Sequence, residues 1–324
     1  MSSSRREFLC HSSVVLAGTA LPCWSWAAAP ASVAADPNAP ASAAGTLLIG
    51  GDLKVNRLGF GAMRITGDGI WGEPRDANEA LAVLRRAVAL GTNFIDTADA
   101  YGPYISERLI KEALYPYPPG LLIATKGGQV RPRRDEWLPD GRPQHLRAAC
   151  EASLARLKLD RIDLYQLHRP DPQVPFEDSI GELAKLQKEG KIRHIGVSNV
   201  TVEQLAKARA LVKVVSVQNR YNIIDRRWDD VLAVCERERI AFLPWAPLAQ
   251  DATRAVARPS GMVGRVAAIA KARHIDMSQA NLAWLLARSP VILPIPGTSR
   301  VDHLEDNVGA AKIKLTPEEM ARIG

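Results

Sequence analysis

The sequence contains few cysteines, no long apolar segment and no block of basic residues. Its four cysteines form no CxxC pair, which argues against a structural zinc site. A chain of 324 residues also needs no disulfide to hold its fold. Because no run of eighteen apolar residues occurs, we expect no stable membrane insertion. The net charge of +7 is spread along the chain, so nucleic acid is not an expected partner and small anionic ligands remain.

The first 45 residues differ in composition from the rest of the chain. Arg5-Arg6 precedes an apolar stretch, Val14–Leu21, and the small residues Ala27–Ala29 follow. This order of charged, apolar and small residues is typical of a secretory signal, so we predict a signal peptide over residues 1–35. Residues 36–45 are rich in Ala, Pro and Ser, and predict a linker.

The arginine pair Arg5-Arg6, followed by Phe8-Leu9, resembles the twin-arginine export signal of bacteria. The resemblance implies a periplasmic or otherwise exported protein, moved already folded. If the signal is not used, the protein is cytoplasmic. The alternative is a disordered tail in which the arginine pair occurs by chance.

From residue 46 onward, short apolar runs alternate with amphipathic segments. Thr46–Ile49 and Leu53–Val55 flank a Gly-Gly-Asp turn and predict a hairpin. Eight further apolar runs predict buried strands: Arg57–Phe60, Asn93–Ile95, Leu121–Thr125, Ile162–Leu167, Ile192–Val197, Val214–Gln218, Ile240–Leu243 and Val291–Leu293. Apolar residues at helical spacing predict helices over Ala77–Leu90, His145–Leu157 and Asp178–Glu189.

Buried strands separated by helices indicate a parallel sheet in an α/β protein. Eight such units over residues 46–324 fit a (β/α)8 TIM barrel preceded by the hairpin. A doubly wound sheet is the alternative, and would need a glycine-rich phosphate loop after its first strand. Gly59-Phe60-Gly61 begins that pattern, but Arg64 stands where the third glycine belongs.

Four polar residues follow the predicted strands at the end where a barrel places its chemistry. These residues are Asp96, Tyr101, Lys126 and His168. Each has an ordinary explanation by itself: a solvated rim lysine, a loop histidine, or an aspartate that caps the next helix. Their joint occurrence on successive strand ends favours a catalytic site.

The residue types suggest proton transfer to an oxygen. The pKa of a free tyrosine is about 10, and a nearby ammonium is expected to lower it. An aspartate would keep the lysine charged and aimed, and a neutral histidine could donate a hydrogen bond to a substrate oxygen. This combination suits protonation of a developing alkoxide. No serine or cysteine nucleophile with an adjacent base stands out, and no HExxH motif indicates a metal site.

The chain resembles the aldo-keto reductases over residues 46–324. The resemblance rests on Gly91–Gly102, Ala124–Gly128, Asp163–His168, Gly196–Asn199, Gln218-Asn219 and Ile295–Ser299, which occur in the family's order. It implies reduction of a small aldehyde or ketone with NADPH, or with NADH, and without a metal. It further implies that Tyr101 is the general acid, that Lys126 and Asp96 tune it, and that His168 orients the carbonyl.

The resemblance also implies a set of cofactor-binding residues. These are Ser198, Asn199, Gln218, Trp245, Pro247, Leu248, Pro296, Gly297, Thr298, Ser299, Arg300, His303, Asp306 and Asn307. Ser198, Asn199 and Gln218 would hold the nicotinamide carboxamide, and Trp245 would stack on the ring. From the residues alone, Trp245 could equally be part of the core.

The segment Ile295–Arg300 precedes a predicted helix that ends near Ala310. A helix start binds anions, and Arg300 suits the 2′-phosphate of NADPH. Two positions depart from the family pattern: Gly297 replaces a lysine, and His303 replaces an arginine, which leaves the preference for NADPH over NADH open. A plain capped helix would account for the same residues.

The substrate pocket is expected to be open, with walls from Met63, Trp71 and the insertion Gly127–Arg142, and with Tyr101 and His168 facing the carbonyl. We expect a monomer. The alternative to an active reductase is a regulatory or sensor barrel that binds the cofactor with little turnover.

Overall fold

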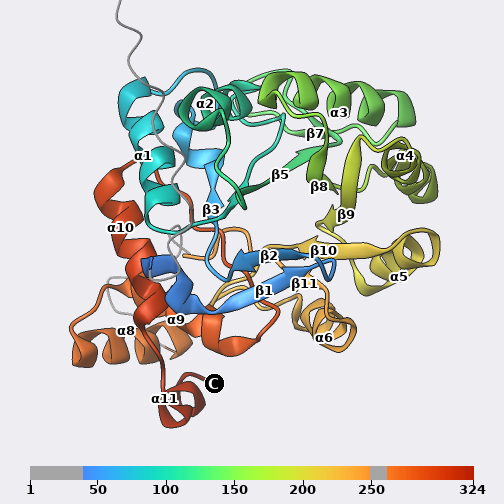
Figure 1. The fold of residues 1–324 in the computed structure, drawn as a ribbon. Helices are drawn as coiled ribbons and strands as arrows, with labels where there is room; N and C mark the ends of the chain where they lie inside the picture. The colour runs from blue at the N-terminus through green and yellow to red at the C-terminus, as the bar shows by residue number, and fades with distance from the viewer. Residues whose placement is uncertain (1–38, 249–260) are drawn as a thin grey trace, which may run out of the picture. The chain divides into compact units, whose positions relative to one another are not determined.

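The computed structural model describes residues 39–248 and 261–324 (Figure 1). The predicted signal peptide and the start of the linker lie outside these residues. The first sheet is the predicted hairpin, in which β1 (Thr46–Ile49) pairs antiparallel with β2 (Leu53–Asn56).

Seven parallel strands form the central sheet, in the order β11-β10-β9-β8-β5-β4-β3. Their bounds are β3 Phe60–Gly61, β4 Phe94–Asp96, β5 Leu122–Gly127, β8 Ile162–Leu167, β9 Ile192–Ser198, β10 Val214–Gln218 and β11 Ala241–Phe242. Each overlaps one of the predicted apolar runs. The insertion after β5 carries a separate antiparallel pair, β6 (Gln129–Val130) and β7 (Leu138–Pro139).

The segment after Val291 closes this sheet into a barrel. Ile292 forms a single parallel bridge with Phe242 of β11. On the other side, the amides of Gly59 and Gly61 donate to the carbonyls of Pro294 and Pro296 at 2.9 and 3.2 Å. The eighth predicted strand is therefore an irregular extended segment, because the two prolines have no N–H to donate to a ladder. The predicted (β/α)8 barrel with its N-terminal hairpin is confirmed.

Two glycines allow the closing segment to approach β3. A Cβ on Gly61 would lie 2.6 Å from the carbonyl oxygen of Ile295, and one on Gly297 would lie 2.5 Å from that of Gly61. No side chain fits at either position. The glycines of Gly59-Phe60-Gly61 thus serve barrel closure.

Helices follow the strands and cover the outside of the sheet (Figure 1). They are α1 Ala77–Ala89, α2 Ile105–Leu114, α3 Pro143–Leu157, α4 Phe176–Lys188, α5 Val202–Leu211, α6 Asp229–Glu238, α8 Gly261–Arg273, α9 Met277–Arg288, α10 Val301–Gly309 and α11 Pro317–Ile323. Asp76 caps α1 through the amide of Glu79 at 3.0 Å. The left-handed Gly91, with φ of +86°, lies just beyond the end of α1. In the described ranges, no helix is long and apolar enough to cross a membrane.

The barrel interior is apolar at the end covered by the hairpin. Ile49 and Val55 of the hairpin belong to one buried cluster with Phe94, Leu122 and Leu164 of the central strands. We call this set the inner cluster. The hairpin therefore packs against the interior of the barrel at the amino ends of the strands, and the carboxyl ends remain for polar side chains.

The described part of the predicted linker packs on the barrel. Pro40–Ala44 form a 3-10 turn, η1, in which Ala41 and Ala44 are buried. The amide of Ala41 donates to the carbonyl of Leu90 at 3.0 Å. Alanine side chains are small enough to let the turn lie close to the barrel surface, so this segment contributes to the core.

Candidate active site

Alternate side chains of β4, β5 and β8 point into the barrel. Phe94, Leu122 and Leu164 face inward as members of the inner cluster. Two or four residues further along the chain come Asp96, Lys126 and Gln166 in the same strands, and His168 directly after β8. Because side chains alternate along a strand, these polar groups also face inward, at the carboxyl ends of the strands.

The Lys126 ammonium is fully buried and uses all three of its protons. Its Nζ donates to Asp96 Oδ2 at 2.7 Å, to the Thr97 carbonyl at 2.8 Å and to the Tyr101 hydroxyl at 3.3 Å. The other carboxylate oxygen, Asp96 Oδ1, accepts from Gln166 Nε2 at 3.1 Å and Gln218 Nε2 at 2.8 Å. Asp96 therefore joins the lysine to two amide side chains and holds it against Tyr101.

Burial opposes charge on Lys126, but Asp96 and Tyr101 together outweigh it and raise the pKa of Lys126. The lysine is accordingly an ammonium at neutral pH. For Tyr101, burial raises the pKa, Lys126 lowers it and Asp96 raises it, and the net direction is upward. The expectation that the lysine lowers this pKa below its usual value is therefore wrong for this structure. The carboxylate that charges the lysine cancels much of its effect, and the low-dielectric site disfavours a phenolate. Tyr101 is a neutral phenol at neutral pH.

The imidazole of His168 lies beside Tyr101. The two ring centroids are 5.8 Å apart and the rings are nearly perpendicular. Burial, together with the charges of Lys126 and Arg169, lowers the pKa of His168 well below its usual value, so the ring is neutral. Its Nδ1 is buried and has no hydrogen-bond partner among the described residues.

An aromatic wall stands next to the tyrosine and the histidine. The Trp137 ring centroid is 6.4 Å from that of Tyr101 and 6.5 Å from that of His168. The Arg131 guanidinium lies 3.6 Å from the Trp137 centroid and 5.4 Å from that of Trp71. It also donates to the Ile70 carbonyl at 2.9 Å, which fixes the stack.

Two other residues, Trp71 and Met63, were predicted to line the substrate pocket. Trp71 bridges to Gly102, one residue after Tyr101. Met63 is half-buried in the short turn η2 (Ala62–Ile65), which directly follows β3.

The residues predicted to hold the nicotinamide converge at the ends of β9, β10 and β11. The Asn199 side chain donates to the His168 carbonyl at 3.1 Å and accepts from Trp245 Nε1 at 3.1 Å. The Ser198 hydroxyl donates to the Gln218 carbonyl at 2.7 Å. Trp245 is half-buried, while Pro247 and Leu248 next to it are buried.

The predicted phosphate residues surround the start of α10. Arg300 is exposed and pairs with Asp302, with a contact of 2.9 Å from Nε to Oδ1. The Val301 amide donates to the Glu79 carboxylate at 3.0 Å. Pro296, Thr298 and Asn307 are buried, whereas Ser299, His303 and Asp306 are exposed. In this structure the carboxylates of Asp302 and Glu79 thus bind the arginine and the backbone amide that would be available to a phosphate.

Two residues of the site, Gln166 and Arg131, were not predicted from the sequence. Gln166 is a fully buried amide in the otherwise apolar run Ile162–Leu167, and its inward position in the strand was a usable signal. Arg131 gave no such signal, because its role depends on two tryptophans that only folding brings to it. Among the described residues, no group of three acidic, histidine or cysteine side chains could hold a metal ion.

The structure thus brings a buried phenol, a buried ammonium and a neutral histidine together at the carboxyl rim of a (β/α)8 barrel, the end at which such barrels carry their active sites. The chain matches the aldo/keto reductase family over residues 57–324. It is 52% identical over 283 residues to an uncharacterised oxidoreductase of Schizosaccharomyces pombe, covering 87% of this chain and 90% of the relative. It is 42% identical over 280 residues to pyridoxine 4-dehydrogenase of Escherichia coli, covering 84% and 95% respectively.

Solved structures agree with these matches. An aldo-keto reductase of Klebsiella pneumoniae in complex with NADPH superposes with a TM-score of 0.71 at 27% identity, covering 86% of this chain and 93% of that one. The chain belongs to the aldo/keto reductase family. It is therefore an oxidoreductase of a family that reduces carbonyl groups with a nicotinamide dinucleotide.

Proposed function

We propose that the protein reduces a small aldehyde or ketone to the alcohol with NADPH, and that Tyr101 supplies the proton. The observation that carries the proposal is the hydrogen-bonded chain from Asp96 through Lys126 to the Tyr101 hydroxyl, next to a neutral His168.

The residues at the strand ends fit a nicotinamide dinucleotide. Asn199 and Ser198 place polar groups beside the half-buried Trp245 ring, and the buried His168 Nδ1 has no hydrogen-bond partner among the described residues. Ser198, Asn199, Gln218 and Trp245 would hold the nicotinamide end. Pro247, Leu248 and the loop Pro296–Arg300, with His303, Asp306 and Asn307, would hold the rest. When bound, the cofactor supplies the hydride that reduces the carbonyl carbon.

The residues at the start of α10 bear on the preference between NADPH and NADH. The relative from K. pneumoniae is known with NADPH, which supports NADPH here. Arg300 is the cation available for a 2′-phosphate, but it would have to leave Asp302 to bind one. NADH therefore remains a usable cofactor in the proposal.

The protein's own groups then divide the work on the substrate. The neutral His168 donates a hydrogen bond to the carbonyl oxygen and fixes its position. Tyr101, a neutral phenol, donates its proton to the oxygen as negative charge develops there. The proton leaves a phenolate 3.3 Å from Lys126 Nζ, and the ammonium stabilises that charge. Asp96, held by two glutamines, keeps the ammonium in place.

The test is the Tyr101→Phe variant, which removes the proton and keeps the ring. We expect reduction of a generic aldehyde to fall by at least about a hundredfold, the usual contribution of general acid–base catalysis. NADPH binding, followed by fluorescence titration, should change little. The exposed Tyr104→Phe change is the matched control and should leave turnover unaltered. A near-normal kcat in Tyr101→Phe would contradict the proposed mechanism.

The alternative is a regulatory barrel that binds the cofactor without turnover. It predicts tight NADPH binding in the wild type and no reduction of any aldehyde. The intact chain of Asp96, Lys126 and Tyr101 favours the enzyme, because cofactor binding alone needs no buried proton donor.

We further propose that the protein is exported by the twin-arginine route. Arg5-Arg6 and the apolar segment behind it support this, since a protein that folds around a large cofactor needs a route for folded cargo. Replacing both arginines with lysine keeps the charge and should trap an uncleaved, active precursor in the cytoplasm. Cell fractionation and the mass of the N-terminus measure this. Full-length wild-type protein found only in the cytoplasm would overturn the export proposal and leave the reductase proposal standing.

A further inference from the structure

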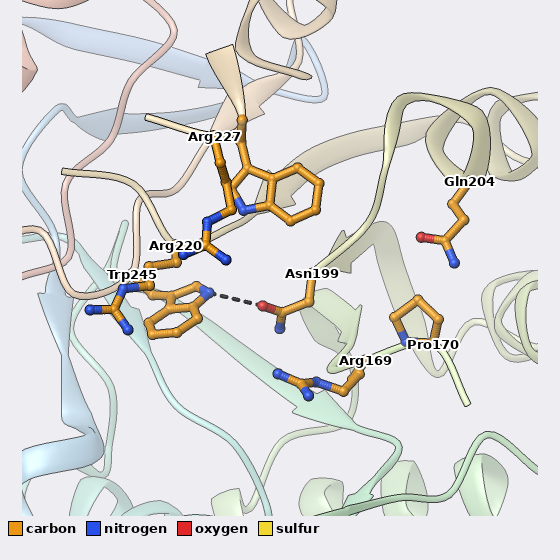
Figure 2. A pocket seen from close by; sticks show the side chains of 8 residues that line it. Arg169, Pro170, Asn199, Gln204, Arg220, Arg227 and Trp245 are labelled. Atoms are coloured by element: carbon orange, nitrogen blue, oxygen red, sulfur yellow. Dashed lines mark hydrogen bonds between the residues drawn. The ribbon is translucent and has the colours of Figure 1, made fainter. Parts of the chain in front are cut away.

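An open cleft with a volume of about 430 Å³ lies beside the candidate active site (Figure 2). Loops after β8, β9, β10 and β11 form it. Its lining includes Arg169, Arg220 and Arg227, with Asn199, Trp228 and Trp245. We call it the arginine cleft. Its volume falls in the range of about 300–1,000 Å³ that is typical of small-molecule sites, so it can hold more than a single ion.

The arginine cleft is joined to the catalytic residues. Arg169 directly follows His168 in the chain, and Asn199 donates to the His168 carbonyl at 3.1 Å. Trp245 donates in turn to Asn199 at 3.1 Å. In Figure 2 the guanidinium of Arg169 extends toward Asn199 and Trp245, while Arg220 lies beside Trp245. A molecule in the cleft would therefore lie next to the groups that we propose act on the carbonyl.

The cleft carries excess positive charge. Among the residues that the structure describes, three arginines line it and no acidic residue does. Asp225, outside the lining, pairs with Arg227 at 2.7 and 2.8 Å and lies 3.3 Å from Arg220 Nε. The single Asp225 carboxylate thus lies against two arginines. Arg169 takes part in no ion pair within residues 39–248 and 261–324. Arg220 Nε is buried and, despite its distance to Asp225, is not aligned for a hydrogen bond with any described residue.

The position of Arg169 points to the substrate rather than to the cofactor. The proposed cofactor residues extend from the ends of β9 to β11 onward to the start of α10, and Asn199 and Trp245 among them also line the cleft. Arg220 and Arg227 follow β10, within that span, whereas Arg169 follows β8, on the side of Asn199 away from β10 and β11. The cleft therefore reaches from the nicotinamide residues to an arginine beyond them, where the other reactant would lie.

We propose that the arginine cleft binds a carboxylate or phosphate on the carbonyl substrate, so that the preferred substrates are anionic aldehydes or ketones. The inference rests on the proposed reductase function and adds the substrate class to it. Guanidinium groups match the planar oxygens of both anions and bind them by paired, charge-assisted hydrogen bonds. The Trp228 ring in the lining would contact the apolar body of such a substrate.

Matched substrates test the proposal. 4-Carboxybenzaldehyde and its methyl ester have the same ring and aldehyde and differ in charge, and 4-formylphenyl phosphate and 4-methoxybenzaldehyde form the phosphate pair. We expect kcat/KM to be at least about tenfold higher for the anionic member of one or both pairs, the size of a charge-assisted contact. The pair with the larger ratio identifies the anion.

Arg169→Gln and Arg220→Gln should each reduce that ratio severalfold, mainly through KM of the anionic member. Arg169 is exposed, so its replacement should not disturb folding. The exposed Arg237→Gln near the end of α6, which does not line the cleft, is the control and should leave the ratio unchanged.

Three outcomes would overturn the proposal. The two members of each pair could react equally well, or the ratio could persist in both variants. The variants could instead weaken NADPH in a fluorescence titration without changing substrate KM, which would assign the arginines to the cofactor.

Failure of the reductase function itself is recognised separately, as no turnover of any aldehyde. Calorimetric binding of the product analogue 4-(hydroxymethyl)benzoate to the protein as purified then decides about the cleft. Binding that Arg169→Gln weakens would support the anion site, and no binding would overturn it.

Discussion

Replacing Asp96 with asparagine tests the electrostatics of the site apart from its catalysis. One oxygen of Asp96 accepts from Lys126 at 2.7 Å, and the other accepts from Gln166 and Gln218. Asparagine offers one acceptor and an amide that donates. Whichever way it turns, a buried donor faces another donor, either the ammonium or the two glutamines.

The loss of stability in Asp96→Asn follows from the burial of Lys126, which has no exposed surface. Removing one partner of a buried ion pair typically lowers the free energy of unfolding by about 3–5 kcal/mol. About 3 kcal/mol corresponds to roughly two pKa units on the remaining charge. Without the carboxylate, burial dominates, and the pKa of Lys126 should fall below its usual value.

The sign of the pH dependence distinguishes the two proteins. In the wild type the pKa of Lys126 is raised, so its stabilisation is complete below the unfolded value of about 10.4 and is lost as pH rises through the folded value. In Asp96→Asn the folded pKa is lowered, so the unfolded chain binds the proton more readily and stability rises with pH. The difference in the free energy of unfolding between the wild type and Asp96→Asn should therefore narrow between pH 7 and about pH 9.5.

Urea unfolding at both pH values, followed by circular dichroism, measures this difference. The double variant Asp96→Asn with Lys126→Met removes the stranded charge and should be more stable than Asp96→Asn alone, although it is inactive. A loss below about 1 kcal/mol in the single variant, with no change between the two pH values, would refute the buried ion pair as the organiser of the site.

Two further predictions concern the ends of the barrel. Arg300→Ala should weaken the binding of NADPH several-fold more than that of NADH in a fluorescence titration. Asp302→Asn frees the arginine and should strengthen the binding of NADPH more than that of NADH. Equal effects on both cofactors would show that Arg300 does not contact the 2′-phosphate. A chain beginning at residue 39 should match the full chain in activity and melting temperature, whereas one beginning at residue 46 should lose about 1–2 kcal/mol of unfolding free energy, since it lacks three buried alanines and the Ala41 hydrogen bond. Equal melting temperatures for the two truncations would mean that η1 contributes nothing.

Much of the fold and the centre of the site could be predicted from the sequence. Strands β8 and β10 have the predicted bounds, and helix α1 differs from its prediction by one residue. The period of two along a strand is a local property, and it already directs Asp96, Lys126 and His168 to the same side. Because parallel strands in a barrel place their carboxyl ends together, the alternation of strand and helix was enough to bring these residues to one rim.

Other features depend on neighbours far away in the sequence. The closing segment is irregular because Pro294 and Pro296 meet β3 across the barrel, and Gly61 and Gly297 are needed only because two backbones touch there. The pairing of Arg131 with two tryptophans and the burial of Ala41 likewise depend on residues that only folding brings near.

The protonation of the site was also decided by tertiary structure. The sequence places an ammonium near Tyr101, which by itself lowers the pKa of the phenol. Folding adds burial and the Asp96 carboxylate, and their sum raises it. The identities of the charged groups are local information, but the water removed from around them and their distances depend on the whole barrel. For that reason the sequence determined which residues meet at the rim, and only the folded structure determined that Tyr101 holds its proton there.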